Sequence, residues 1–235
     1  MEEVFRSGTL EMSASPLSGL AAGPAWSDLP ANRILAVAAI ILTIISLPDL
    51  FRIAPHLGYA FSRSRGAAEL EHSLGTARTR NAVALLFLLP FCLVADRYAP
   101  VRPAFLPQPS AAWSAPLTFG LFAGWLLVRR LCYALLRPRR MGAEAFAALR
   151  NNPYNYFIPL TVLMLLSCGC ISLVGASDAL VRTVLCWEIA VFALFCLFRS
   201  GQILNAHCSG FATIMYLCGL EIIPAAAYVA VVMFF

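Results

Sequence analysis

The stretch Ile34–Leu50, ILAVAAIILTIISLPDL, decides the fold class of this chain. Its only charged residue is Asp49, and Arg33 and Arg52 lie just outside it. A helix of about 20 apolar residues spans the hydrocarbon core of a lipid bilayer. The stretch therefore predicts a membrane-spanning helix near 33–51.

The remainder of the chain repeats this pattern. Of its 235 residues, 60% are hydrophobic and 12% are charged, whereas about a quarter of the residues of a soluble domain are charged. Such a composition excludes a disordered chain. We expect an all-α polytopic membrane protein, a bundle of six transmembrane helices in a single domain over 33–235, surrounded by the lipid bilayer. The Ser-, Gly- and Pro-containing residues 1–32 predict a flexible tail. The other five helices are expected near 80–96, 114–136, 155–175, 183–199 and 211–235.

The arginines predict an orientation. All 17 basic residues are Arg, and the loops on the inner side of a membrane carry the excess of positive charge. With the N-terminus outside, the outer segments hold five of them, and the other twelve (17 − 5) fall in inner connections. This asymmetry favours both termini outside. The five are Arg6, Arg33, Arg97, Arg102 and Arg182.

The fourth helix is predicted to begin at the polar segment 151–156, NNPYNY. Proline suits the first turn of a helix, because its missing N–H has no intrahelical partner there. The preceding segment, 141–150, has two interpretations. It is a short helix lying on the inner membrane surface, or a polar elbow that only fixes the topology.

Glu221 is the strongest candidate for a functional residue, because ionisable side chains inside a bilayer are costly. It lies ten residues into the last predicted helix, near the membrane midplane, and Pro224 frees a backbone carbonyl beside it. Glu188 in the preceding helix is expected at a similar depth. Arg129 and Arg130 interrupt the third helix, so that one could neutralise a Glu or both could extend to the lipid headgroups.

Three roles are open to the two glutamates. Paired or protonated carboxyls can hold helices together through interhelical hydrogen bonds. The same groups can relay protons in a transporter, or take part in catalysis if a nucleophile or metal lies beside Glu221. Whether Glu188 and Glu221 face each other depends on the rotation of each helix, which the sequence does not specify.

Motifs for catalysis, nucleotides, metals and haem are missing from the sequence. Most of the eight Cys lie inside apolar runs, where a free Cys behaves as a small hydrophobic residue. We therefore predict no catalytic residue, no metal and no cofactor. Nucleic acid is not an expected partner, since the positive charge is spread between apolar runs and does not form one basic face.

The string Ile214–Pro224, IMYLCGLEIIP, resembles the ending of a family of integral membrane proteins of Bacteroidota, known as domain-of-unknown-function family 4271. Tyr154-Asn155 followed by Pro159-Leu160 is similar to a mid-chain segment of that family, and Arg199 to its usual Arg before the last helix. The resemblance covers roughly residues 115–235.

This resemblance implies a location, the bacterial inner membrane, but no reaction. It directs attention to Tyr216, Glu221 and Pro224. The favoured function is a non-enzymatic subunit, accessory or assembly factor of a larger membrane system, with a membrane-protein partner or as a homo-oligomer. The alternatives are a small proton-linked transporter or channel that uses Glu221 and Glu188, and an intramembrane enzyme acting on a lipid-like substrate.

Overall fold

The computed structural model describes residues 26, 29–62, 66–98, 114–136, 141–226 and 230. All regular elements in this part of the chain are helical, so the all-α prediction is confirmed there. Five helices are long and apolar enough to cross a membrane, and the protein is a membrane-spanning helical protein. A further apolar helix, Gly210–Ala226, is shorter. The predicted sixth helix extends beyond the described residues and so does most of the predicted tail 1–32, so the count of six stays a prediction.

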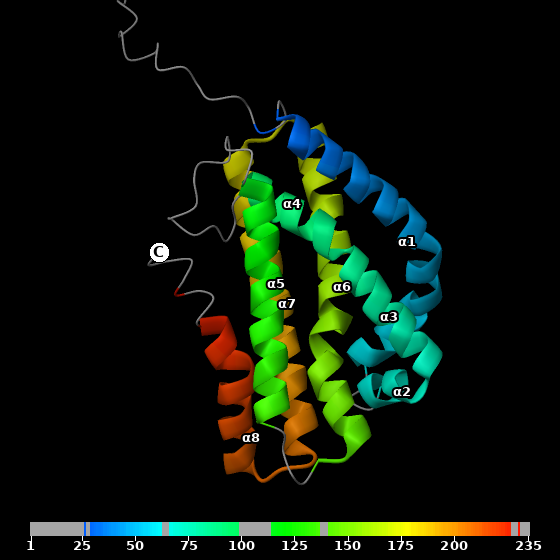
Figure 1. Ribbon diagram of the computed structural model, residues 1–235, viewed down its shortest axis with the longest axis vertical. Coiled ribbons are helices and arrows are strands. Elements are labelled where there is room, and N and C mark those ends of the chain that lie inside the picture. Colours follow the sequence, from blue (N-terminus) through cyan, green and yellow to red (C-terminus); the bar gives the residue numbers. More distant parts are fainter. Residues whose placement is uncertain are drawn as a thin grey trace, which may run out of the picture.

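Helix α1 (Pro30–Ser62) runs along the outside of the bundle from one end to the other (Figure 1). It continues eleven residues beyond the predicted end at 51, with Pro48 and Pro55 inside it. Only 11% of its most apolar window is buried within the protein. The short helix α2 (Gly66–His72) follows at the same end of the molecule.

The second span consists of two helices, α3 (Leu74–Leu86) and α4 (Leu88–Tyr98). They meet at a break at Phe87, where the chain bends (Figure 1). Pro90 explains the break, because a proline has no N–H and its ring clashes with the carbonyl four residues earlier, that of Leu86. The span begins at Leu74, six residues before the predicted start at 80.

Helices α5 (Ser114–Leu135), α6 (Ala143–Leu173) and α7 (Asp178–Asn205) form the centre of the bundle (Figure 1). Helix α6 is continuous from Ala143, so the prediction that a helix begins within 151–156 is wrong, and residues 143–150 form neither a separate short helix nor a polar elbow. Pro153 and Pro159 lie in its interior. Prolines are tolerated in membrane helices where neighbouring groups satisfy the freed backbone atoms.

The chain returns along the bundle in α8 (Gly210–Leu217), which continues into a π-helical segment, η3 (Cys218–Ile222). The N–H of Ile223 donates to the carbonyl of Cys218, five residues earlier. This wide turn places Glu221 inside the bundle, where its side chain is 8% exposed.

Two buried apolar clusters fill the space between the central helices. The first joins α4, α6 and α7, and the second joins α5, α6, α7 and the segment α8–η3. The second cluster surrounds the polar side chains of the candidate site. Its buried members are Tyr133, Met141, Leu149, Ile203, Leu204 and Leu220.

Candidate functional site

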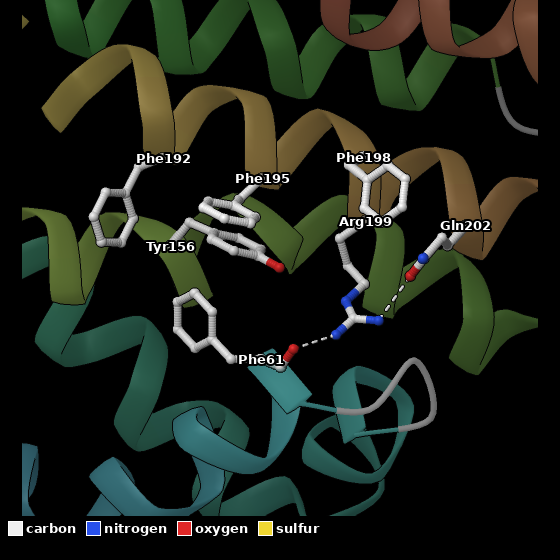
Figure 2. Close-up of a pocket in the computed structure, with 7 residues that line it drawn as sticks. All are labelled: Phe61, Tyr156, Phe192, Phe195, Phe198, Arg199 and Gln202. Atoms are coloured by element: carbon white, nitrogen blue, oxygen red, sulfur yellow. Dashed lines mark hydrogen bonds between the residues drawn. The ribbon is translucent and has the colours of Figure 1, made fainter. Parts of the chain in front are cut away.

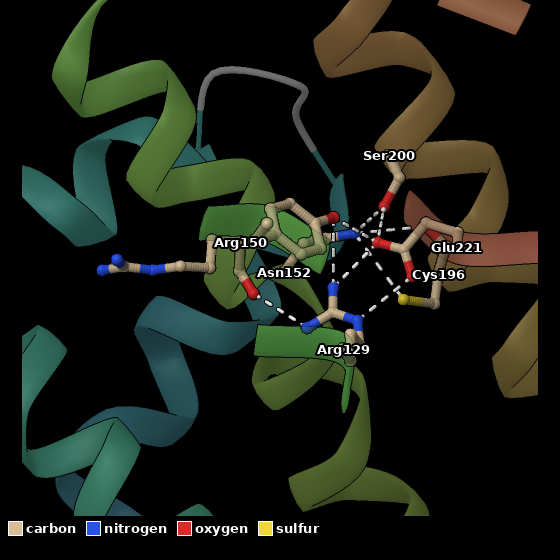
Figure 3. A network of polar contacts seen from close by, with 7 residues as sticks. Arg129, Arg150, Asn152, Cys196, Ser200 and Glu221 are labelled. Carbon is tan, nitrogen blue, oxygen red and sulfur yellow. Dashed lines mark hydrogen bonds and ion pairs between the residues drawn. The ribbon is translucent and has the colours of Figure 1, made fainter. Parts of the chain in front are cut away.

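An ion pair between Arg129 and Glu221 lies at the centre of the candidate site (Figure 3). Arg129 Nη2 is 2.8 Å from Glu221 Oε1, and Arg129 Nε is 3.3 Å from Oε2. The two residues are 3% and 8% exposed. This two-pronged geometry is the strong form of an arginine–carboxylate interaction, and it joins α5 to η3.

Tyr133 lies one helical turn after Arg129 on the same face of α5. Its hydroxyl donates to Glu221 Oε1 at 2.6 Å and accepts from Arg129 Nη2 at 3.2 Å. The guanidinium carbon also lies 4.7 Å from the centre of the Tyr133 ring, within the range of a cation–π contact. A third donor of Arg129, Nη1, reaches the backbone carbonyl of Arg150 on α6 at 3.1 Å.

Helices α6 and α7 complete the network. Asn152 Nδ2 donates to Ser200 Oγ and to the backbone carbonyl of Cys196, both at 3.1 Å. Ser200 Oγ in turn lies 3.4 Å from Glu221 Oε1. The cluster formed by Arg129, Tyr133, Asn152, Ser200 and Glu221, named here the interhelical polar cluster, therefore connects α5, α6, α7 and η3.

The charges of this cluster are paired within it. Its one cation and one anion neutralise each other, and both carboxylate oxygens already have partners. Asn152 Oδ1 is a buried acceptor with no hydrogen bond. Across the described ranges, no group of three or more His, Cys, Asp and Glu side chains is placed to hold a metal ion.

The structure brings together two of the seven predicted site residues, Arg129 and Glu221. Pro224 is buried one turn after Glu221, and Tyr216 packs at the edge of the surrounding apolar cluster. Arg130 points outward and donates to the Tyr154 hydroxyl at 3.2 Å. Arg199 is next to Ser200 in sequence but is bonded elsewhere, to the backbone at the end of α1.

Glu188 lies away from the cluster. It is twelve residues before Ser200 on α7, about 18 Å along the helix axis, and Ser200 is the α7 residue that contacts Glu221. The two carboxyls are therefore at different depths, and the expectation of a similar depth is wrong. That expectation placed the end of the helix near Arg199, whereas α7 continues six residues past it. Glu188 is half-buried, and its Oε2 atom is enclosed without a hydrogen bond.

A second buried ion pair was missed by the sequence analysis. Arg80 on α3 is 0% exposed, and its Nη2 lies 2.6 Å from Glu71 Oε1 on α2. Arg80 Nη1 also donates to Asn155 Oδ1 at 3.2 Å, and Asn151 Nδ2 donates to Glu71 Oε2 at 3.1 Å. This group fastens α2 and α3 to α6.

At the opposite end of the bundle, Asp96 collects three donors. Trp26 Nε1 donates at 2.8 Å, Thr118 Oγ1 donates at 3.0 Å, and Ser114 Oγ also donates. Asp96 is 1% exposed. The carboxylate thus joins the end of α4 to the start of α5 and to Trp26.

Two signals in the sequence point to residues that the sequence analysis missed, Tyr133 and the asparagines of α6. Arg129 and Tyr133 are four residues apart, which places them on one helix face. Asn151, Asn152 and Asn155 lie within an otherwise apolar stretch, where polar side chains usually bond to neighbouring helices. Interpreting the asparagines as the start of a helix hid this second signal.

Comparison with known protein families, with curated proteins and with solved structures gives no match for this chain. The fold and the site therefore define a class only, a helical membrane-spanning protein with an interhelical ion pair in its interior.

Proposed function

We propose that this protein is a non-enzymatic component of the bacterial inner membrane, acting as a subunit, accessory or assembly factor of a larger membrane system. The observation that carries the proposal is the saturation of Glu221. Its oxygens accept from Arg129, Tyr133 and Ser200, so this buried carboxylate is used to hold three helical segments together, α5, α7 and η3. Removing one partner of such a buried pair leaves an uncompensated charge and is strongly destabilising, which supports a structural role for Glu221.

A partner surface is available on the outside of the bundle. The most apolar windows of α1 and α7 are each only 11% buried within the protein. Lipid or another membrane protein must cover these faces, since apolar surface of this extent is not left in water. A second protein, or a second copy of the chain, is the proposed occupant of part of this surface.

The proposed topology has six spanning helices with both termini outside. Support comes from the course of α8 and η3, which run back along the bundle from the end where α7 finishes (Figure 1). Arginines of the described part of the chain lie unevenly, with Arg78, Arg129, Arg130 and Arg150 toward that end. Inner-side segments carry this excess.

A fusion experiment tests the topology. A reporter that is active only inside the cell, fused after Asn205, is expected to be active. The same reporter fused at the C-terminus is expected to be inactive, and a reporter active only outside should show the reverse. Equal activity of one reporter at both positions contradicts the sixth span.

A proton-linked transporter or channel is the second candidate. One observation favours it: Glu221 lies in a π-helical turn, a feature frequent at functional sites, with the unsatisfied Asn152 Oδ1 in the same cluster. Transport through Glu221 requires the carboxylate to exchange Arg129 for another partner during the cycle.

Two measurements separate these candidates. The tagged protein is extracted from native membranes in mild detergent, with an unrelated tagged polytopic protein as control, and its companions are identified by mass spectrometry. A membrane protein at fixed stoichiometry, absent from the control, is expected. In proteoliposomes, proton flux through the wild type is expected to equal that through Glu221→Gln. A lone protein whose flux disappears in a folded Glu221→Gln variant contradicts the component function and supports transport.

A further inference from the structure

A pocket of about 350 Å³ lies between α6, α7 and the end of α1 (Figure 2). Five of its seven lining residues are aromatic, and the other two are Arg199 and Gln202 on α7. Phe61 forms edge-to-face contacts with Tyr156 and Phe192, with ring centres 4.7 and 6.5 Å apart. The pocket is therefore a rigid aromatic surface with a polar end.

The lining residues of α7 form one stripe along the helix. Phe192, Phe195, Arg199 and Gln202 are separated by three, four and three residues, the spacing of a single helix face. The stripe is about 15 Å long. Its apolar part comes first, and its polar part lies toward the end of α7. A ligand with one apolar end and one polar end can therefore lie along the stripe.

Arg199 brings an unbalanced charge to this pocket. Its Nη2 donates to the carbonyls of Ala60 and Phe61 at 3.0 and 2.6 Å, and its Nη1 donates to Gln202 Oε1 at 2.7 Å. With the further hydrogen bond between Arg199 and the Tyr156 side chain, these bonds use four of the five N–H donors of a guanidinium. No ion pair joins Arg199 to a carboxylate within the ranges that the structure describes, although the residue is only 8% exposed.

The depth of Arg199 puts a phospholipid phosphate within reach of its side chain. Helix α7 has 28 residues, so it is about 42 Å long, and an upright, centred helix extends about 6 Å beyond each side of a 30 Å hydrocarbon core. Arg199 is six residues before the end of α7, about 9 Å from it. The backbone of Arg199 therefore lies about 3 Å inside the hydrocarbon core, so its long side chain can meet a phosphate at the headgroup boundary, and Phe192 lies at the level of the acyl chains.

We propose that this pocket binds an anionic phospholipid, with the phosphate at Arg199 and Gln202 and an acyl chain over Phe195 and Phe192. Guanidinium is suited to phosphate because its planar donors match the oxygens and it is weakly hydrated. The one full charge among the lining residues is positive, so a lipid with net negative charge is preferred over a zwitterionic one. This inference goes beyond the proposed function and does not depend on it.

Native mass spectrometry of the delipidated full-length protein tests the proposal, with phosphatidylglycerol, phosphatidylcholine and inorganic phosphate as probes. Phosphatidylglycerol is expected to bind about tenfold more tightly to the wild type than to Arg199→Gln, the size of a lost charge-assisted hydrogen bond. Arg199→Lys keeps the charge and is expected to retain most of the binding, which covers the case in which Arg199→Gln fails to fold.

A pair of variants on α7 tests the aromatic part. Phe195 lines the pocket and Leu194 does not, although they are neighbours with exposures of 57% and 66%. Phe195→Ala is expected to weaken phosphatidylglycerol binding several-fold, and Leu194→Ala to leave it unchanged. Equal binding of phosphatidylglycerol and phosphatidylcholine overturns the proposal, and so do equal effects of Phe195→Ala and Leu194→Ala. Displacement of phosphatidylglycerol by an equal concentration of inorganic phosphate would assign the site to free phosphate and also overturn it.

Discussion

Arg129 and Glu221 are 92 residues apart in the sequence, and their side chains meet at 2.8 Å in the interior of the bundle. The pair joins α5 to η3, a segment close to the end of the described part of the chain. Both side chains are almost fully buried. Losing one of them is therefore expected to cost more stability than losing one member of an exposed ion pair.

Removing one partner of this pair is expected to destabilise the protein strongly. Glu221→Leu leaves Arg129 buried without its counter-charge, at an expected cost of about 3–5 kcal/mol in the free energy of unfolding. Arg129→Met should cost a similar amount. The double variant should recover much of the loss, because a buried pair replaced by apolar side chains is often neutral.

Unfolding in detergent micelles, followed by circular dichroism, measures all three variants. Arg130→Met is the matched control, since Arg130 is the next residue, is exposed, and makes one hydrogen bond to Tyr154. It should change stability by about 0.5 kcal/mol or less. Additive losses in the double variant would show that the two residues do not act as a pair.

Tyr133→Phe removes the hydroxyl that donates to Glu221 and accepts from Arg129. The expected loss is about 1–3 kcal/mol, because a buried charged group loses a hydrogen bond. Tyr216→Phe provides the comparison, as Tyr216 is half-buried on the edge of the same apolar cluster. Melting temperatures of both variants in one detergent decide the matter, and a Tyr216→Phe effect as large as that of Tyr133→Phe would refute the assignment.

Arg80→Met is expected to loosen α2 from the bundle. Glu71, Asn151 and Asn155 all bond to Arg80 or to its carboxylate partner, and the buried Glu71 would lose its counter-charge. Limited proteolysis should then cut near α2 at a protease concentration that leaves the wild type intact. Arg78→Met, two residues away at an exposed position, should be digested like the wild type.

Glu188→Leu is expected to be neutral or stabilising, in contrast to Glu221→Leu. The Oε2 atom of Glu188 is enclosed without a hydrogen bond, and such an atom carries a desolvation cost of about 1–3 kcal/mol. Thermal unfolding in the same detergent tests this expectation. A loss of more than 1 kcal/mol would mean that the hydrogen bond between Glu188 and Ser167 outweighs this desolvation cost.

Hydropathy located each long helix, because an apolar run of the right length has few other structures in a membrane. It misplaced several helix ends, and the reason is specific. Arg80 and Asn152 resemble loop residues in a hydropathy profile, yet both lie inside helices where a neighbouring helix supplies their partners. Pro153 was expected in the first turn of a helix and lies in a helix interior, as Pro159 does.

Neither the pairing of the charges nor the relative depth of the two glutamates could be predicted from the sequence. Arg129 was a possible counter-charge for a Glu, and the structure selects Glu221. The choice depends on the rotation of each helix about its axis, which packing sets. Ser200 and Asn152 were not predicted as members of the cluster because a Ser or Asn in a membrane helix carries no charge that marks it out.

The wide turn at Cys218–Ile222 makes this part of the chain sensitive to its length more than to its composition. Each residue of a helix turns the chain by about 100°, and the wide turn accommodates one extra residue. Deleting Gly219 would restore ordinary helical spacing and leave the residues after the turn in phase with α8, so that only positions inside the turn, Glu221 among them, shift relative to Arg129. A one-residue deletion here is thus expected to weaken the ion pair by less than Glu221→Leu does, although both charges are kept, whereas a substitution at exposed Ile222 leaves the length of the turn, and so the ion pair, in place.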